Sequence, residues 1–205
     1  MQTYPPHVSL FEQGTPVRAI ALIDEGLVKL LRWEKREEAV TVAIRFPGWS
    51  LGTAAAILRE PHVVSAETLT NCRILSIPAD DFLQLVTSNS HVSADLHRTH
   101  ARELIDYICH LSGLGALTTK QRLFRLIERM VAAERSPGEA GPLRVALPFS
   151  YSELASAIVT TRQHLARVLK QLEDENLVHH EKGWLEITDI KMFLAVVNKQ
   201  IRTDL

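Results

Sequence analysis

One short stretch of the chain carries the side chains best suited to bind a nucleic acid. Between Thr161 and Glu173, basic and amide side chains occur with no acidic residue among them: Arg162, Gln163, His164, Arg167 and Lys170. Arginine can donate two hydrogen bonds to guanine, and a glutamine amide can both donate to and accept from adenine, whereas lysine pairs with phosphate as a point charge. The residue types therefore predict contacts with base edges in the major groove of double-stranded DNA.

Two predicted helices position these side chains. Ser150 and Glu153 have the spacing of a capping box, which predicts the start of a first helix that runs to Ile158. Thr160 or Thr161 can cap a second helix, with Gln163 reaching back to complete a second box. The apolar residues of this second helix recur at i, i+3, i+4 and i+7, which predicts one buried face: Leu165, Val168, Leu169 and Leu172. On spacing alone, an ordinary amphipathic helix pair with a solvated basic face stays the alternative.

A predicted hairpin follows the second helix. An extended segment begins at Leu177, a turn is predicted at 181–183, and residues 184–187 alternate between exposed and buried positions as a strand does. Residues 143–147 form a further predicted strand before the first helix. A helix-turn-helix followed by a hairpin is the pattern of a winged helix.

This region resembles the C-terminal domain of the CRP/FNR superfamily of bacterial transcription regulators, named after the cyclic-AMP receptor protein and the fumarate–nitrate-reductase regulator. The residues that carry the resemblance are Glu153-Leu154-Ala155, Thr161-Arg162-Gln163, Arg167-Val168-Leu169, Leu172-Glu173 and Asn176-Leu177-Val178. Val159 stands where many relatives have glycine, so either the turn avoids left-handed backbone geometry or this residue is strained.

The resemblance implies a transcription regulator that binds double-stranded DNA as a homodimer at an inverted-repeat promoter site, with RNA polymerase as a further partner and no membrane. It implies DNA contacts from these residues: Ser150, Thr161, Arg162, Gln163, His164, Arg167 and Lys170. It also implies an α+β fold with three parts. These are an N-terminal double-stranded β-helix (jelly-roll) sensor domain at residues 1–90, a dimerisation helix and hinge at 91–115, and a winged helix-turn-helix at 116–205.

The pattern of the first part agrees with that fold. Residues 1–88 are predicted as β structure, because short apolar segments alternate with turns at 13–14, 24–26, 34–38 and 47–48. Many short strands at regular spacing are typical of a sandwich or barrel.

A helical period replaces the strand pattern at residues 93–114. Its apolar residues are spaced 3, 4 and 3 apart, as in the seam of a coiled coil: Ala101, Leu104, Ile108 and Leu111. This spacing predicts a homodimer, with a helix that packs only on its own barrel as the alternative. Gly113 and Gly115 predict a break after the seam.

The candidate effector site lies where relatives bind the phosphate of a cyclic nucleotide. In those relatives a Gly-Glu pair opens the site and an arginine before a Ser/Thr-Ala pair closes it. Here Thr53 follows Gly52, and Val64 precedes Ser65, so both charged anchors are missing and cyclic AMP is not expected. The effector is therefore left unassigned, with these candidate effector-binding residues: Gly52, Thr53, Ser65 and Leu104.

Other cofactors find little support in the sequence. Cys72 and Cys109 match no zinc, iron–sulfur or disulfide spacing and are predicted to be buried thiols in a reducing cytoplasm. The iron–sulfur cysteines of oxygen-sensing relatives are absent. Haem bound through His62 stays open, although a histidine in a loop is predicted to be solvated. Arg59 is predicted to be a surface loop residue.

Composition excludes several function classes. The chain has 205 residues, 46% of them hydrophobic and 23% charged, which predicts an ordinary globular protein with two small domains. No apolar run approaches the roughly 18 residues that a membrane helix needs, so a soluble cytoplasmic protein is expected. The net charge is −1, so DNA binding depends on the local basic face. No nucleophile–base pair, phosphate loop or metal cluster is found, so an enzyme is not predicted. The alternative function is a small-molecule or haem sensor that acts mainly through protein contacts.

Overall fold

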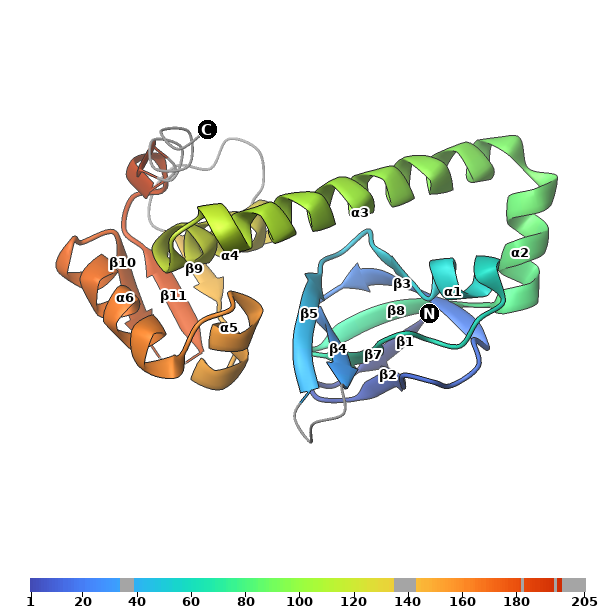
Figure 1. The fold of residues 1–205 in the computed structure, drawn as a ribbon, viewed down its shortest axis with the longest axis horizontal. Helices are drawn as coiled ribbons and strands as arrows, with labels where there is room; N and C mark the ends of the chain where they lie inside the picture. The colour runs from blue at the N-terminus through green and yellow to red at the C-terminus, as the bar shows by residue number, and fades with distance from the viewer. Residues whose placement is uncertain (34–38, 135–142, 182, 194, 197–205) are drawn as a thin grey trace. The chain divides into compact units, whose positions relative to one another are not determined.

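The computed structural model describes residues 1–33, 39–134, 143–181, 183–193 and 195–196. The predicted turn at 34–38 and residue 182 of the predicted hairpin turn lie outside the described residues. The chain divides into two compact units, Met1–Ile108 and Cys109–Leu205 (Figure 1). The predicted α+β fold class is confirmed: a β-rich first unit, a long helix and a second unit with a helix-turn-helix.

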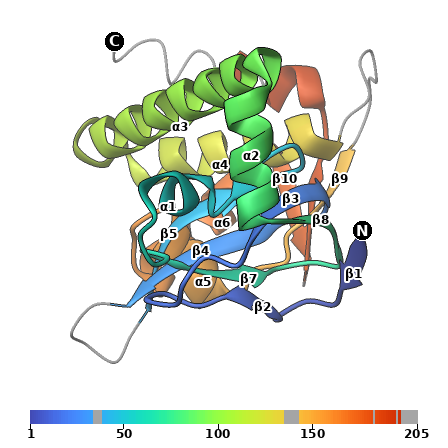
Figure 2. The same ribbon diagram turned by 90° about the vertical axis from the view of Figure 1, so that its right-hand side faces the viewer.

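Two antiparallel sheets of four strands each form the first unit. One has the order β1 (Gln2–Tyr4), β8 (Cys72–Pro78), β3 (Ala19–Glu25) and β6 (Ser50–Leu51). The other has the order β2 (Ser9–Phe11), β7 (Ser65–Thr68), β4 (Val28–Trp33) and β5 (Ala39–Arg45). In Figure 2, β3 and β8 lie above β4, β7 and β2.

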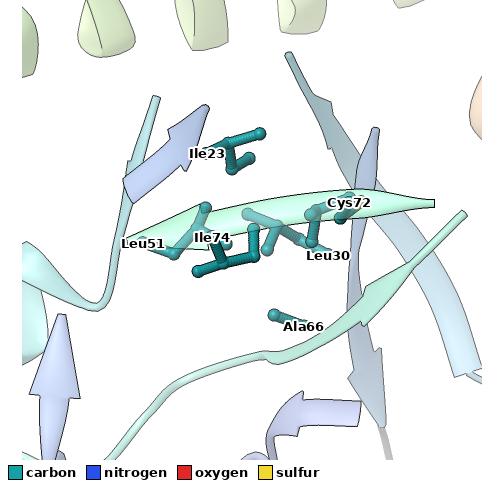
Figure 3. Close-up of a cluster of buried hydrophobic side chains, with 7 residues drawn as sticks. Ile23, Leu30, Leu51, Ala66, Cys72 and Ile74 are labelled. Carbon is teal, nitrogen blue, oxygen red and sulfur yellow. The ribbon is translucent and has the colours of Figure 1, made fainter. Parts of the chain in front are cut away.

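The core of the first unit lies between the two sheets. Its buried side chains come from strands of both: Ile23, Val28, Leu30, Leu51, Ala66, Cys72 and Ile74 (Figure 3). Burying one such large aliphatic side chain contributes about 1.5–3 kcal/mol. The predicted turn at Gly26 is confirmed, with a φ of +88° and a Cβ position only 2.4 Å from the carbonyl oxygen of Asn71. Only glycine fits there.

Three helices complete the first unit: α1 (Thr53–Leu58), α2 (Ala79–Ser88) and α3 (Ser90–Ala116), of which α3 continues into the second unit. The expectation of β structure up to residue 88 is wrong for α2. Asp80 and Asp81 in its first turn favour the positive end of the helix dipole, and Phe82 packs against Ile20 and Ala56.

The predicted helix break at Gly113 and Gly115 is also wrong, because α3 continues through both residues to Ala116. Gly113 is buried, and a Cβ there would lie 3.2 Å from Cδ1 of Leu117. This glycine therefore permits close packing and does not end the helix. At the other end, Oδ1 of Asn89 accepts hydrogen bonds from the first backbone amides, so the helix begins at Ser90.

The second unit combines helices with a three-stranded antiparallel sheet of order β10-β11-β9. Its elements are α4 (Thr119–Glu134), β9 (Leu143–Ala146), α5 (Tyr151–Ala157), α6 (Arg162–Asp174), β10 (Val178–Glu181) and β11 (Trp184–Ile187). The four strand residues from Trp184 to Ile187 alternate between exposed and buried, as the sequence predicts. Phe124 of α4 packs edge-on against Phe193, with ring centroids 5.2 Å apart.

The two cysteines differ. Cys72 is buried, as predicted, but Cys109 is exposed on α3, so that part of the prediction is wrong. None of the described helices combines the length and the hydropathy that crossing a bilayer requires.

Candidate nucleic-acid interface

The helix-turn-helix begins at a complete capping box. The hydroxyl of Ser150 accepts from the backbone N–H of Glu153 at 3.2 Å, and the Glu153 carboxylate accepts from the backbone N–H of Ser150 at 2.9 Å. Both bonds satisfy amides that a helix start leaves unpaired. The prediction of this box is confirmed, and it fixes where α5 begins.

The turn between the two helices contains a strained residue. Val159 has a φ of +53°, the left-handed region that is unfavourable for a β-branched side chain. Of the two alternatives given by the sequence, the strained one is therefore observed. The side chain of Val159 is 52% exposed, so little packing compensates for the strain.

Arg122 of α4 holds this turn, and sequence reasoning missed it. Its Nε donates to the carbonyl of Ile158 at 2.8 Å, and its Nη2 donates to the carbonyl of Val159 at 3.1 Å. Its Nη1 donates to the carbonyl of Leu117 at 2.6 Å. One guanidinium thus joins the start of α4 to the end of α5 and the strained turn. In the sequence, Arg122 is simply one polar residue of an amphipathic helix.

Thr161 caps the second helix. Its Oγ1 accepts from the backbone N–H of His164 at 3.2 Å. Gln163 is therefore the second residue of α6 and not the third, so the expected second capping box, with Gln163 reaching back, is wrong. Its amide remains available for another contact.

The basic residues of α6 lie on its exposed face, opposite a buried apolar face. The buried residues are Leu165, Val168, Leu169 and Leu172, each no more than 6% exposed. The exposed residues are Arg162, Gln163, His164, Arg167 and Lys170. Within the described part of the chain, Arg162, Gln163, Arg167 and Lys170 make no side-chain hydrogen bond or ion pair. Their donors are therefore directed to solvent or to a ligand.

Acidic residues near the end of α6 are occupied by contacts within the protein. Glu173 accepts from the backbone N–H of His180 at 3.0 Å, and Glu175 pairs with Lys120 at 2.7 Å. These carboxylates therefore do not neutralise the basic face of α6.

The hairpin of β10 and β11 contacts α5 through an aromatic pair. The hydroxyl of Tyr151 lies 3.4 Å from Nδ1 of His180, and the two rings meet edge-on at 5.5 Å. Arg144 of β9 pairs with Glu181 at 2.9 Å and lies over the ring of Trp184 at 4.9 Å. The hairpin, β9 and α5 thus form one connected surface beside α6.

The predicted seam on α3 is uncovered in the single chain. Ala101 is exposed, and Leu104, Ile108 and Leu111 are 60%, 56% and 65% exposed. Such a row of large apolar side chains is rare on a monomer surface unless it is an interaction site. At helical spacing from Leu104 and Leu111, His100 and Tyr107 contact the first unit, His100 through Thr53 of α1 and Tyr107 through Arg45 of β5.

The candidate effector residues are only partly brought together. Gly52 has a φ of +87° at the start of α1, and the buried Thr53 hydroxyl lies 3.1 Å from Nε2 of His100. Ser65 instead accepts from the backbone N–H of Gln13 at 2.9 Å, so its hydroxyl supports the β7 region. Leu104 belongs to the exposed seam.

His62 and Arg59 were both placed in a surface loop by the sequence. Arg59 is exposed, as predicted. For His62 the expectation of a solvated side chain is wrong: it is 4% exposed and stacks on Phe11 with ring centroids 3.8 Å apart. Burial lowers the pKa of His62, because the interior disfavours the charged imidazole.

A buried arginine beneath α3 is the second residue that sequence reasoning missed. Arg45, at the end of β5, is 4% exposed and donates from Nη2 to the hydroxyl of Tyr107 at 2.5 Å. Its guanidinium lies 4.3 Å from the ring centroid of Trp49 and 5.1 Å from that of Tyr107. Glu103 is the nearby acid, and burial raises its pKa even though the charge of Arg45 acts in the opposite direction. Among the described residues, no group of three metal-ligating side chains is found.

Two family models match the chain. The cyclic nucleotide-binding domain matches residues 1–89, and the Crp-like helix-turn-helix domain matches residues 121–195. The cyclic AMP receptor protein of Thermus thermophilus is 25% identical over 186 residues, covering 91% of this chain and 82% of the relative. The cAMP-activated global transcriptional regulator CRP of Haemophilus influenzae is 22% identical over 181 residues, covering 87% and 80%.

Solved structures show the same fold. FixK2 from Bradyrhizobium japonicum is 16% identical and superposes with a TM-score of 0.80, covering 95% of this chain and 94% of that one. A transcriptional regulator of the CRP/FNR family from Thermus thermophilus is 19% identical with a TM-score of 0.77, covering 97% and 98%.

Proposed function

This chain belongs to the CRP/FNR superfamily of bacterial transcription regulators, and from that premise we propose that it binds an inverted-repeat promoter site as a homodimer through α6. Regulators of this family bind DNA and act as dimers. Its relatives are transcription regulators rather than enzymes, and we propose no catalytic role for it.

The observation that carries the proposal is the division of α6 into two faces. The apolar face is buried in the second unit, and the basic face makes no side-chain hydrogen bond or ion pair with any described residue through Arg162, Gln163, Arg167 or Lys170. A module that acts only through protein contacts has no need of such a face. An α-helix with exposed arginine and amide groups has the dimensions and donors that the major groove accepts.

The side chains of this face suggest a base code. Arg162 and Arg167 suit guanine, because their forked donors match O6 and N7. Gln163 suits adenine, because its amide can donate to N7 and accept from the N6 amino group. Lys170 suits a phosphate, which positions the helix without reading sequence.

Three further residues lie at helix starts on the same surface. The hydroxyl groups of Ser150 and Thr161 accept hydrogen bonds from backbone N–H groups of the protein. Each hydroxyl can still donate its own hydrogen to a phosphate oxygen of DNA. His164 is exposed in the first turn of α6. We propose that Ser150, Thr161 and His164 contact the sugar–phosphate backbone of DNA and not the bases.

A homodimer through α3 would supply the second recognition helix. Its seam is Ala101, Leu104, Ile108 and Leu111, whose apolar side chains are exposed in one chain and would be covered in a pair. Two symmetric recognition helices call for two half-sites about one helical turn apart. RNA polymerase at the promoter is the further partner we propose.

Selection of binding sites from random DNA tests the code. We expect the wild-type protein to select an inverted repeat and the Gln163→Glu protein to select a different base at one position per half-site, because the carboxylate can only accept. Arg167→Ala should cost about 1–3 kcal/mol at its own base pair, whereas Lys170→Ala should weaken all sequences alike. Identical half-sites for the wild type and Gln163→Glu would show that Gln163 reads no base.

Cyclic AMP is named for relatives of this chain, but we propose that it is not the effector here. Thr53 and Val64 stand where the cassette of cyclic-nucleotide-binding relatives has its glutamate and its arginine. Each missing charge-assisted hydrogen bond would be worth about 1.5–3 kcal/mol. Isothermal titration calorimetry should show no binding of cyclic AMP at micromolar concentration, and micromolar affinity would contradict the proposal.

A further inference from the structure

Arg45 is a buried charge in the first unit. It lies at the end of β5 and is 4% exposed, and an arginine side chain does not lose its proton in a protein. Moving such a charge out of water costs several kcal/mol unless hydrogen bonds and an opposite charge replace the lost hydration. A buried guanidinium therefore needs partners.

The protein supplies few of them. A guanidinium has five N–H donors in one plane, and a single donor group of Arg45, Nη2, reaches an acceptor, the hydroxyl of Tyr107. The rings of Trp49 and Tyr107 lie over the guanidinium and cover its faces. They give no hydrogen-bond acceptor to the N–H groups at its edge. Within the described chain, Arg45 forms no ion pair and no other side-chain hydrogen bond.

Glu103 does not complete the site. Its carboxyl group feels the charges of Arg45, His100 and Asp106, yet the net effect of its surroundings is to raise its pKa, because burial outweighs the attraction to Arg45. A carboxylate firmly paired with an arginine has its pKa lowered instead. Among the described residues, Glu103 forms no ion pair with Arg45, so the edge donors of Arg45 are left for a partner outside this part of the chain.

We propose that Arg45 anchors an anion-binding site between β5 and α3, and that its ligand is a small oxyanion, a carboxylate or a phosphate group. Such a group places two oxygens in the plane of the guanidinium and accepts two parallel hydrogen bonds. The covered faces and the low exposure of Arg45 select for a compact group that approaches the edge. The positive charge of this site comes from Arg45 on β5. In relatives that bind cyclic nucleotides, an arginine at the position of Val64 supplies it instead. The site concerns the first unit alone and stands whether or not α6 reads DNA.

The site also adjoins the seam. His100 and Tyr107 of α3 contact Thr53 of α1 and Arg45 of β5. Leu104 lies one helical turn from each of them on the same helix, and Ile108 directly follows Tyr107. An anion that orders Arg45 and Tyr107 would fix this part of α3. Occupancy is therefore expected to strengthen dimerisation.

Thermal unfolding of the full chain tests the site. Potassium phosphate and potassium acetate are each compared with potassium chloride at matched ionic strength, so the two arms separate phosphate from carboxylate. At about 100 times the dissociation constant, the preferred anion should raise Tm by roughly 5–10 °C. The shift should disappear in Arg45→Met, which keeps the apolar stem, and should persist in Arg73→Met, which removes an exposed arginine of the same unit.

Arg45→Lys covers the case in which Arg45→Met does not fold, because it keeps the charge but lacks two parallel donors, so the shift should fall by at least half. The inference is overturned if neither anion raises Tm of the wild type above chloride. It is equally overturned if the shift in Arg45→Met or Arg45→Lys equals that of the wild type.

Discussion

Replacing Arg122 with methionine should weaken sequence-specific DNA binding without touching any residue of α6. Methionine keeps most of the stem but removes the donors that hold the carbonyls of Ile158 and Val159. Without them, Val159 is free to leave its left-handed conformation, where its φ is +53°. The axis of α6 then loses its fixed direction relative to α5.

The magnitude follows from the strain at Val159. A left-handed conformation costs an L-residue about 1–2 kcal/mol, and in the wild type the hydrogen bonds of Arg122 offset this cost. Without Arg122, Val159 relaxes in the free protein, and the same cost is subtracted from the free energy of DNA binding. That corresponds to a loss of roughly 5- to 30-fold in specific affinity. Affinity for unrelated DNA depends on phosphate contacts and should change little.

Fluorescence anisotropy on the selected half-site duplex and on a scrambled duplex measures both affinities. Arg125→Met is the matched control, because it removes the same charge from the same helix. Among the described residues, the side chain of Arg125 hydrogen-bonds to the carbonyl of Cys109 and to neither carbonyl of the turn. Glycine adopts left-handed geometry without strain, so adding Val159→Gly to Arg122→Met should restore specific binding. If the double variant binds as weakly as Arg122→Met, the reasoning is refuted.

Three further predictions concern the first unit and the seam. Gly26→Ala should destabilise the unit by about 2–5 kcal/mol in urea unfolding, because its Cβ would meet the backbone at 2.4 Å, whereas Gly14→Ala, with a similar φ and open space, should cost about 1–2 kcal/mol. Burial lowers the pKa of His62, so the folded state binds fewer protons than the unfolded chain, and stability should fall as the pH drops below about 6.5. His62→Leu should reduce that slope in Tm measured from pH 7 to pH 5, and an unchanged slope would exclude His62 as its source. Leu104→Glu should convert the dimer to a monomer in light scattering, and an unchanged mass would exclude the seam.

Local patterns predicted much of the second unit. The alternation of residues 184–187 and the helical spacing of Leu165, Val168, Leu169 and Leu172 both report burial on one face, which is a property of neighbouring residues. The capping box at Ser150 depends on residues three apart. These features were readable because their physical cause lies within one turn of a helix or one strand.

The features that were missed have causes far away in the chain. Arg45 is buried because of Tyr107, 62 residues later, and Arg122 holds carbonyls 36 and 37 residues later. No spacing rule reports such contacts. The conformational freedom of glycine predicts a helix end at Gly113, yet its small size is what matters here, because Leu117 packs against it.

The two faces of α6 allow natural selection to change the DNA-contacting residues separately from the residues that stabilise the fold. Stability of the second unit depends on Leu165, Val168, Leu169 and Leu172, and the groups available to DNA are on other positions of the same helix. Substitutions at exposed positions away from special contacts usually change stability by no more than about 0.5 kcal/mol. Under the proposed base code, the target sequence can therefore diverge between related regulators by single replacements, such as a change at Gln163, while the fold that presents them is inherited intact.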